Sequence, residues 1–267
     1  MAKTPANKAI FITGGGSGIG RAVAQRFARE GWFVGLADVD EEGMAATATL
    51  LPAGGSSIHK LDVRDRAAWD EALADCAEAA GGRIDAVFNN AGVPLGGPLV
   101  ALSPEEIERT LDVNLKGVIF GAQAAWPWLK ATAPGSCLLN TASAAGIYGT
   151  PQASVYSATK FGVRALTEAL DVEWARDGIA VRDLMPGYIE TPLLDHAVNR
   201  ASNDDVRGKV IAAGLEITPV SHVADAAWAA VNGTKLHTLV GKTAHRLAFA
   251  ARWMPGKLRK QLRGGRK

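Results

Sequence analysis

Several common signatures are missing from this chain of 267 residues. It has only two cysteines, Cys76 and Cys137, which excludes the class of small disulfide-rich scaffolds. Its apolar runs all fall short of the roughly 18 residues that a membrane-spanning helix needs. The first residues, MAKTPANK, lack the architecture of a signal peptide. We therefore expect a reducing, cytoplasmic setting.

Motifs for other chemistries are missing as well. The five histidines do not have the spacing of a metal site, so we expect no metal. No G-x-S-x-G motif of a serine hydrolase surrounds Ser143. With 48% hydrophobic and 21% charged residues, the composition excludes a disordered chain. The net charge of +2 predicts no nucleic-acid partner.

Acidic residues are absent from residues 226–267, which carry ten lysines and arginines. The rest of the chain has 19 basic and 27 acidic residues, a net charge of −8. Within this tail, residues 245–267 combine eight basic residues with Leu247, Phe249, Trp253, Met254, Leu258 and Leu262. Two interpretations stay open: a basic amphipathic segment that contacts an anionic membrane surface, or apolar residues that pack on the protein's own body or on a second subunit.

Short apolar runs alternate with longer segments of helical periodicity. Strands are predicted at 9–14, 32–38, 56–63, 84–92, 136–143, 179–187 and 237–242, and helices at 18–29, 67–80, 103–130, 154–176 and 223–231. Apolar strands separated by helices predict an α/β fold, doubly wound in three layers around a parallel sheet of about seven strands. We expect one domain over residues 1–244, with a substrate lid at about 188–218, and an extension at 245–267.

The first predicted strand runs into the sequence TGGGSGIG at 13–20. Glycines at 14, 18 and 20 permit a tight turn and close approach of a phosphate to a helix N-terminus. A turn that merely tolerates glycine has the same pattern. Asp38 ends the second strand, 18 residues after Gly20, near the ~20 expected for an acid that binds the adenosine ribose. Because a carboxylate there repels a 2′-phosphate, and Ser17 is not basic, the sequence favours NAD over NADP.

Tyr156 and Lys160 lie one turn apart at the start of a predicted helix, so their side chains point into the same space. A free tyrosine has a pKa of about 10, and lowering it by about 3 units requires roughly 4 kcal/mol in favour of the phenolate. A fixed ammonium and a positive nicotinamide ring can supply that preference. Ser143 ends the fifth strand, at the sheet edge where ligands bind in such folds. Taken alone, these residues also fit a solvated helix pair and a turn serine.

The ordered set of motifs resembles the short-chain dehydrogenase/reductase family over roughly residues 8–190. The set comprises TGGGSGIG at 13–20, Asp38, Asp62-Val63, Asn89-Asn90-Ala91-Gly92, Asn114, Ser143, YSATK at 156–160, and Pro186-Gly187 followed by Thr191. The resemblance implies a Rossmann fold and a catalytic tetrad. In it, Tyr156 is the general acid/base and Ser143 polarises the carbonyl. Lys160 binds the nicotinamide ribose and lowers the pKa of the tyrosine, while Asn114 holds a water of a proton relay.

The residues and the resemblance together assign a set of positions to NAD. They are Gly14, Ser17, Gly18, Ile19, Gly20, Asp38, Asp62, Val63, Asn90, Ala91, Gly92, Tyr156, Lys160, Pro186, Gly187, Ile189 and Thr191. The resemblance also implies a homodimer through the helices at 103–130 and 154–176, or a homotetramer. The C-terminal sequence departs from the short strand and glycine pair that end many family members.

The positions expected to face the substrate are mostly apolar and carry no charge. They are Val93, Pro94, Leu95, Ala145, Ile147, Tyr148, Tyr188, Pro192, Leu193 and Leu194. They favour an NAD(H)-dependent oxidoreductase that interconverts a hydrophobic secondary alcohol and its ketone. One alternative is a 3-oxoacyl-thioester reductase of the same family. A second is a nucleotide-binding sensor or scaffold without turnover.

Overall fold

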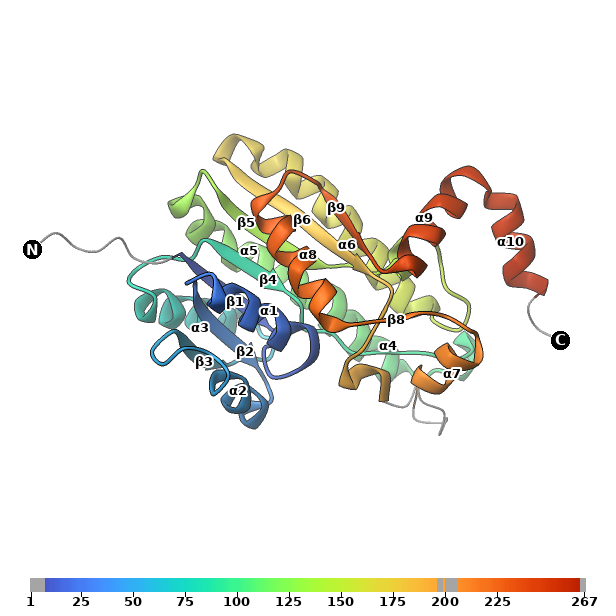
Figure 1. Cartoon of the computed structure of the whole chain (residues 1–267), viewed down its shortest axis with the longest axis horizontal. Coiled ribbons are helices and arrows are strands. Elements are labelled where there is room, and N and C mark those ends of the chain that lie inside the picture. Colours follow the sequence, from blue (N-terminus) through green and yellow to red (C-terminus); the bar gives the residue numbers. More distant parts are fainter. Residues whose placement is uncertain (1–7, 196–198, 200–205, 265–267) are drawn as a thin grey trace, which may run out of the picture.

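A seven-stranded parallel sheet forms the centre of the computed structural model, which describes residues 8–195, 199 and 206–264 (Figure 1). Its strands are β1 (Ala9–Thr13), β2 (Phe33–Asp38), β3 (Ser56–Lys60), β4 (Ala86–Asn89), β5 (Ser136–Thr141), β6 (Ile179–Pro186) and β9 (His237–Val240). Their order, β3-β2-β1-β4-β5-β6-β9, confirms the predicted doubly wound fold. The strand order reverses between β1 and β4, the place where such sheets open a crevice for ligands.

Helices cover both faces of the sheet because successive strand residues point to opposite sides. Ile10 and Ile12 of β1 share a buried cluster with α1 (Gly18–Arg29) and α8 (Val220–Asn232), which lie against each other. Phe11, between them, belongs to the cluster on the other face. That cluster includes side chains of α3 (Arg66–Ala79), α5 (Gly117–Thr132) and α6 (Ser154–Trp174). Burial on both faces explains why β1 is apolar almost throughout.

The helix predicted over 103–130 is interrupted once. Ser103 begins it with a capping box that includes Glu106, and α4 (Pro104–Leu111) follows. Asp112–Lys116 then form a π-helical turn, a wider turn that occurs frequently at functional sites. The chain continues as α5, so the expected helix is present but carries a local widening that the sequence pattern does not show.

The carboxyl ends of three strands differ from the prediction. The runs 56–63, 84–92 and 136–143 pair only over the bounds of β3, β4 and β5. The residues beyond those bounds leave the sheet and form loops at its carboxyl edge. Helix α2 (Glu41–Ala48) is not predicted by the pattern, because only Met44 and Thr47 of its eight residues are buried.

The segment expected to be a lid forms a small layer beside the sheet. It contains β7 (Tyr188–Ile189), a 3₁₀ turn at Pro192–Asp195, α7 (Val206–Ala212) and β8 (Ile217–Thr218). β7 pairs with β8 in parallel. Residues 196–198 and 200–205 of the expected lid lie outside the described residues, as do 1–7 and 265–267.

The C-terminal extension forms two helices, α9 (Lys242–Trp253) and α10 (Pro255–Gly264). Pro255 begins α10, so the boundary between the two helices lies at Met254. α9 follows β9 directly, and α10 packs against α9 at the margin of the molecule (Figure 1). Across the described ranges, no helix is both long and apolar enough to cross a bilayer.

Candidate active site

A cavity of about 690 Å³ lies at the carboxyl ends of β1, β2, β4, β5 and β6. It brings together almost all site residues predicted from the sequence. Those lining it are Gly14, Ser17, Gly18, Ile19, Asp38, Asp62, Val63, Asn90, Ala91, Gly92, Ser143, Tyr156, Lys160, Pro186, Gly187, Ile189 and Thr191. Gly20 and Asn114 are predicted site residues that do not line the cavity. Both contact residues that do, as described below.

The glycine turn after β1 leaves no room for side chains. Gly14 has φ +69°, and a Cβ there would lie 2.8 Å from Nδ2 of Asn90. A Cβ on Gly20 would lie 2.0 Å from the carbonyl oxygen of Gly14. Gly20 therefore serves the close packing of α1 on the turn, whereas Gly14 and Gly18 line the cavity.

The N-terminus of α1 faces the cavity without a side-chain cap. Ser17 is the N-cap residue, but its hydroxyl makes no capping hydrogen bond. The amides of Gly18 and Ile19, which line the cavity, have no intrahelical acceptor because they belong to the first turn. Free amides and the positive end of the helix suit a phosphate group.

Asp38 is held at the end of β2 by two backbone amides. Its Oδ2 accepts a hydrogen bond from Gly16 N at 3.0 Å, and its Oδ1 accepts one from Asp40 N at 3.1 Å. The guanidinium of Arg21 donates instead to the Gly16 carbonyl at 2.5 Å and to Thr47 Oγ1 at 2.9 Å. The carboxylate thus faces the cavity without a cation bonded to it.

The strand ends on either side of the crevice are cross-linked. Asn90 Nδ2 donates to the Thr13 carbonyl at 2.9 Å, while its Oδ1 accepts from Thr141 Oγ1 at 3.3 Å. Thr13 Oγ1 accepts from the amides of Asn90 and Ala91. These bonds connect three elements: β1, strand β5, and the loop that follows β4. They therefore fix the floor of the cavity.

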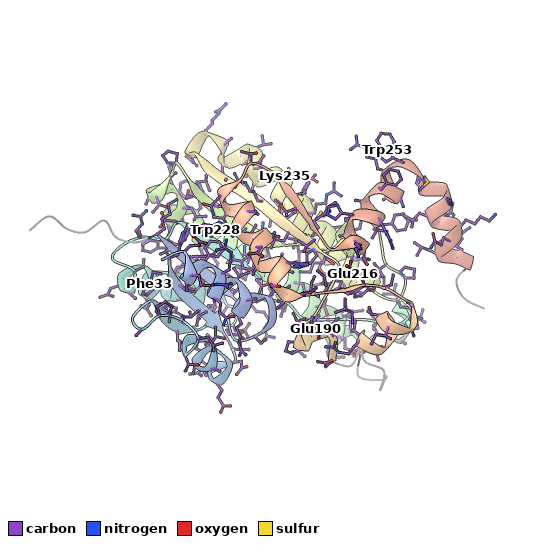
Figure 2. All side chains as sticks on the ribbon, viewed as in Figure 1. Phe33, Glu190, Glu216, Trp228, Lys235 and Trp253 are labelled. Atoms are coloured by element: carbon purple, nitrogen blue, oxygen red, sulfur yellow. The ribbon has the colours of Figure 1, made fainter. Side chains whose placement is uncertain are left out.

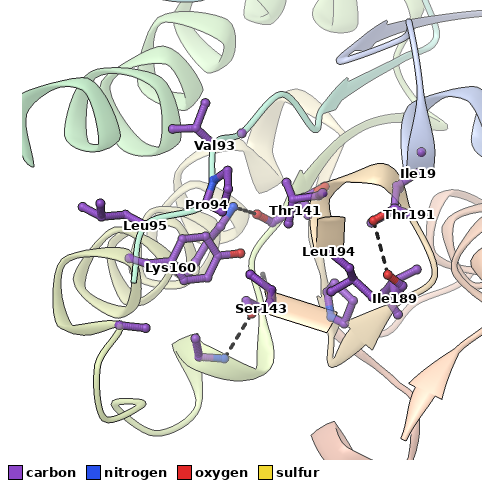
Figure 3. Close-up of a pocket in the computed structure, with 18 of the residues that line it drawn as sticks. Ile19, Val93, Pro94, Leu95, Thr141, Ser143, Lys160, Ile189, Thr191 and Leu194 are labelled. Atoms are coloured by element: carbon purple, nitrogen blue, oxygen red, sulfur yellow. Dashed lines mark hydrogen bonds between the residues drawn. The ribbon is translucent and has the colours of Figure 1, made fainter. Parts of the chain in front are cut away.

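Lys160 is buried beneath this floor, on the first turns of α6. Its Nζ donates to the Thr141 carbonyl at 2.8 Å (Figure 3). The same Nζ lies 5.6 Å from the centroid of the Tyr156 ring. The helical spacing therefore brings the two side chains together, as predicted. Burial lowers the pKa of Lys160 to about 8, which still leaves it mostly protonated at neutral pH.

Tyr156 and Ser143 both line the cavity, and their side chains form a hydrogen bond. Burial raises the pKa of Tyr156, and the hydrogen bond with the Ser143 side chain offsets this only in part. Ser143 Oγ also accepts from Ala145 N at 3.1 Å, which fixes its rotamer. The expected lowering of the tyrosine pKa is therefore not present in the protein alone: burial outweighs the hydrogen bond.

Asn114 occupies the π-helical turn and is fully buried. Its Oδ1 accepts from Val93 N at 2.8 Å, and its Nδ2 donates to the Val93 carbonyl at 2.9 Å. A Cβ on Gly92 would lie 3.3 Å from Asn114 Oδ1 and 3.9 Å from Lys160 Nζ, so the two side chains flank this glycine. Asn114 thus holds the loop after β4 next to the buried lysine.

The other end of the cavity is mostly apolar. Of the positions expected to face a substrate, Val93, Pro94, Leu95, Ala145, Tyr188, Pro192, Leu193 and Leu194 line it. Ile147 and Tyr148 do not, so that expectation is wrong for them. Ile147 packs instead against a buried cluster that includes Val163 and Met185.

Sequence reasoning missed several lining residues that come from distant segments. They are Arg109, Gln152, Val206, Val210, Leu215, Thr243 and Leu247, among others. Gln152 carries the only positive φ of a non-glycine residue within the described chain, +63°. The sequence does not indicate that Leu247 lines a cavity. Its neighbours in space come from segments distant in sequence, and only the folded structure brings them together with α9.

The histidines, cysteines and carboxylates of the described ranges bear on metal and thiol chemistry. No three His, Cys, Asp or Glu side chains there are grouped closely enough to hold a metal ion. Cys76 and Cys137 are both free and buried, and burial raises the pKa of each thiol to about 12.

Residues 8–202 match the family described as short chain dehydrogenase. The chain belongs to the short-chain dehydrogenase/reductase family. Membership makes it an oxidoreductase and agrees with the resemblance inferred from its ordered motifs.

Related proteins cover most of this short-chain dehydrogenase/reductase. Meso-2,3-butanediol dehydrogenase of Serratia marcescens is 37% identical over 185 residues, which are 69% of this chain and 72% of that protein. Levodione reductase of Leifsonia aquatica is 34% identical over 225 residues, 82% of this chain and 83% of that protein. A solved short-chain dehydrogenase/reductase from Burkholderia phymatum in complex with NAD has a TM-score of 0.83 and 27% identity, covering 96% of this chain and 95% of that chain.

Proposed function

We propose that this enzyme interconverts a hydrophobic secondary alcohol and its ketone with NAD(H). The observation that carries the proposal is a single cavity with two unlike ends. One end has the glycine turn and the Asp38 carboxylate. The other has Ser143, Tyr156 and Lys160 beside an apolar wall. Relatives named for a diol and a dione, and a structural neighbour in complex with NAD, support the assignment.

The nucleotide end fits a dinucleotide on its own geometry. The space above Gly14 and the uncapped N-terminus of α1 would take the pyrophosphate. Asp38 would accept hydrogen bonds from the ribose hydroxyls and repel a 2′-phosphate. Asp62 and Val63 line the same end and would flank the adenine. Pro186, Ile189 and Thr191 would line the nicotinamide at the far end.

Tyr156 carries the proton in this proposal. In oxidation the substrate's C–H hydrogen leaves as a hydride and its O–H proton passes to Tyr156 Oη; in reduction Tyr156 returns the proton. NAD(H), when bound, would supply the hydride acceptor or donor, and the oxidised nicotinamide would supply a positive charge that favours the Tyr156 phenolate. Ser143 holds the substrate oxygen within reach of Tyr156 through its hydroxyl. Because burial raises the pKa of Tyr156, the phenolate forms only when nearby positive charge favours it.

Lys160 and Asn114 complete the tetrad without touching the reacting carbon. The Lys160 ammonium lies below the tyrosine ring and would bind the nicotinamide ribose. Asn114 holds the Val93 backbone through both atoms of its amide, so it keeps the loop over this end in place. We propose that a water bound near this amide relays protons from Lys160 to solvent.

The test is a substrate panel assayed with NAD and NADP separately, read by the absorbance of the reduced nicotinamide. We expect turnover of vicinal diols, diones or cyclic secondary alcohols with NAD(H), and little with NADP(H). Turnover restricted to 3-oxoacyl thioesters would replace the alcohol proposal with the thioester reductase. NAD binding by calorimetry without turnover of any substrate would favour a sensor or scaffold.

A further inference from the structure

The C-terminal helical pair, residues 242–264, is the part of the molecule that the catalytic proposal leaves unexplained. Its described cations are Lys242, Arg246, Arg252, Lys257, Arg259, Lys260 and Arg263. Nζ of Lys242 lies 3.7 Å from Oε1 of Glu216. For the other six, no ion pair with an acidic side chain is found among the described residues. The pair is therefore a concentrated cationic surface on a body that is net acidic.

Large apolar side chains are exposed on the same helices. Phe249 is 58% and Trp253 65% exposed. Figure 2 shows Trp253 at the edge of the molecule. Met254 and Leu262 are 37% and 36% exposed. Leu258, in contrast, is 7% exposed. Packing on the protein's own body thus accounts for Leu258 but not for the other four.

The cations and the aromatics share one face of α9. Lys242, Arg246, Phe249 and Trp253 are separated by four, three and four residues, which places them along one side of a helix. The guanidinium of Arg252 lies 5.2 Å from the centroid of the Trp253 ring. Helices that lie in the interface of an anionic bilayer combine Lys and Arg with Trp, Phe and Leu, and α9 and α10 carry this combination of side chains.

We propose that the C-terminal helical pair docks the protein on an anionic lipid surface. Phe249, Trp253 and Leu262 would enter the interface, and the arginines and lysines would face the phosphate groups. Charge favours this occupant over a second copy joined tail to tail, because a two-fold contact would set two acid-free cationic surfaces against each other. The exposed aromatics favour a bilayer over a polyanion, which binds cations without apolar contacts.

Docking would also position the cavity. Thr243 and Leu247 of α9 line it, from a different side of the helix than Phe249, which follows Leu247 by two residues. A lipophilic substrate dissolved in the bilayer would then lie close to the part of the cavity wall that α9 forms. This consequence rests on the proposed function, whereas the binding itself is tested without cofactor or substrate.

The experiment is co-sedimentation of the full-length protein with vesicles of phosphatidylcholine alone or mixed with phosphatidylglycerol, at low and high salt. We expect binding to the anionic vesicles at low salt and release at high salt. Each basic residue near such a surface changes partition about fivefold, so Arg259→Glu/Arg263→Glu should weaken binding at least about tenfold. The matched control is Arg29→Glu/Arg176→Glu, which replaces two arginines of the body. Its binding to anionic vesicles should weaken much less.

A second pair of variants tests the apolar contact. Phe249→Ala/Trp253→Ala should weaken binding severalfold, whereas Leu50→Ala/Ile58→Ala, two exposed apolar residues of the body, should not. Brominated lipids should quench the fluorescence of Trp253, and the loss of that quenching in Trp253→Phe would place the residue in the interface.

Four outcomes would overturn the proposal. One is a protein that stays in the supernatant with anionic vesicles at low salt. Another is equal binding to both vesicle types. A third is binding that needs the arginines but not Phe249 and Trp253, which indicates a general polyanion site. The last is a tail variant that changes the oligomeric state, measured by analytical ultracentrifugation, but does not change binding to vesicles. That result would assign the surface to a second subunit.

Discussion

The two ends of the cavity are built from different parts of the molecule. The nucleotide end consists of strand termini and backbone turns, cross-linked by Thr13 and Asn90. The apolar end is assembled from the loop after β4, the lid, and Leu247 of α9. In the proposed function, the sheet would therefore fix the position of the cofactor and of the reacting groups. Elements added at its edge shape the space for a substrate, and they can vary without disturbing the sheet.

The largest expected effect lies where the two ends meet. Tyr156→Phe deletes the oxygen that we propose carries the proton, and it leaves the glycine turn and Asp38 unchanged. Losing a general acid/base typically lowers turnover by about 10²–10⁴-fold, and we expect a loss at the upper end because no neighbouring side chain replaces the hydroxyl. Steady-state kinetics measures the loss, and calorimetric titration with NAD should give a dissociation constant close to that of the parent.

The assignment of Tyr156 is wrong if the phenylalanine variant keeps half of the parent activity. Tyr188→Phe is the control, since it deletes the hydroxyl of another tyrosine in the same cavity. A smaller loss in that variant would show that the effect belongs to Tyr156 rather than to any polar group near the substrate.

Lys160 makes the catalytic floor less stable than an apolar one. Burial lowers its pKa to about 8 from 10.5, so between those values the folded protein binds fewer protons than the unfolded chain. Stability from this group is present above pH 10.5 and is lost as the pH falls through 8. At neutral pH the charged lysine thus destabilises the fold by about 3 kcal/mol.

Lys160→Met should stabilise the cofactor-free protein at pH 7 while abolishing turnover. We expect a net gain of about 1–2 kcal/mol in the free energy of unfolding, because the unpaired Thr141 carbonyl offsets part of the benefit. Urea denaturation at several pH values measures it, and the gain should shrink as the pH rises above 8. Lys116→Met, at an exposed lysine, is the control; a gain independent of pH would contradict the explanation.

Cofactor choice should respond to Asp38 alone. A phosphate placed a few ångströms from a carboxylate is disfavoured by about 1–4 kcal/mol at effective dielectric constants of 80 to 20. Asp38→Ser should therefore narrow the ratio of kcat/KM for NAD over NADP by a corresponding factor. Asp40→Ser is the matched control, because Asp40 caps α2 by accepting from Gly43 N and does not line the cavity. Equal use of both cofactors by the parent would refute the role of Asp38.

The sequence predicts which residues come together around the glycine turn because the determinants of this geometry are local. A strand, a glycine turn and a helix are contiguous, and Asp38 follows at the spacing of one further strand. Tyr156 and Lys160 are fixed by helical periodicity. The π-helical turn around Asn114 is different: the apolar pattern continues through it, so only the structure shows that the asparagine is turned toward the backbone of Val93.

The apolar end is poorly predicted because its determinants are distant in sequence. Ile147 and Val93 are both apolar residues that follow a strand, yet Ile147 packs against a buried cluster and Val93 lines the cavity. Leu247 lies more than a hundred residues beyond Ser143, and only the return of the chain through β9 brings α9 to the cavity. Fold-level packing, rather than residue type, decides which apolar side chains reach a substrate.

The smallest expected effect tests whether α9 belongs to the substrate end. Leu247→Ala removes part of the apolar wall. For bulky substrates, a lost contact of this size raises the free energy of the bound transition state by about 1 kcal/mol, which lowers kcat/KM about fivefold. The KM for NAD should stay unchanged, because the nucleotide end is built by the sheet. Leu258→Ala gives the comparison: it truncates a buried leucine of α10 outside the cavity lining and should leave substrate kinetics intact. If both variants lower kcat/KM equally, α9 supports the fold rather than the substrate, and the division between the two ends would have to be drawn at the lid instead.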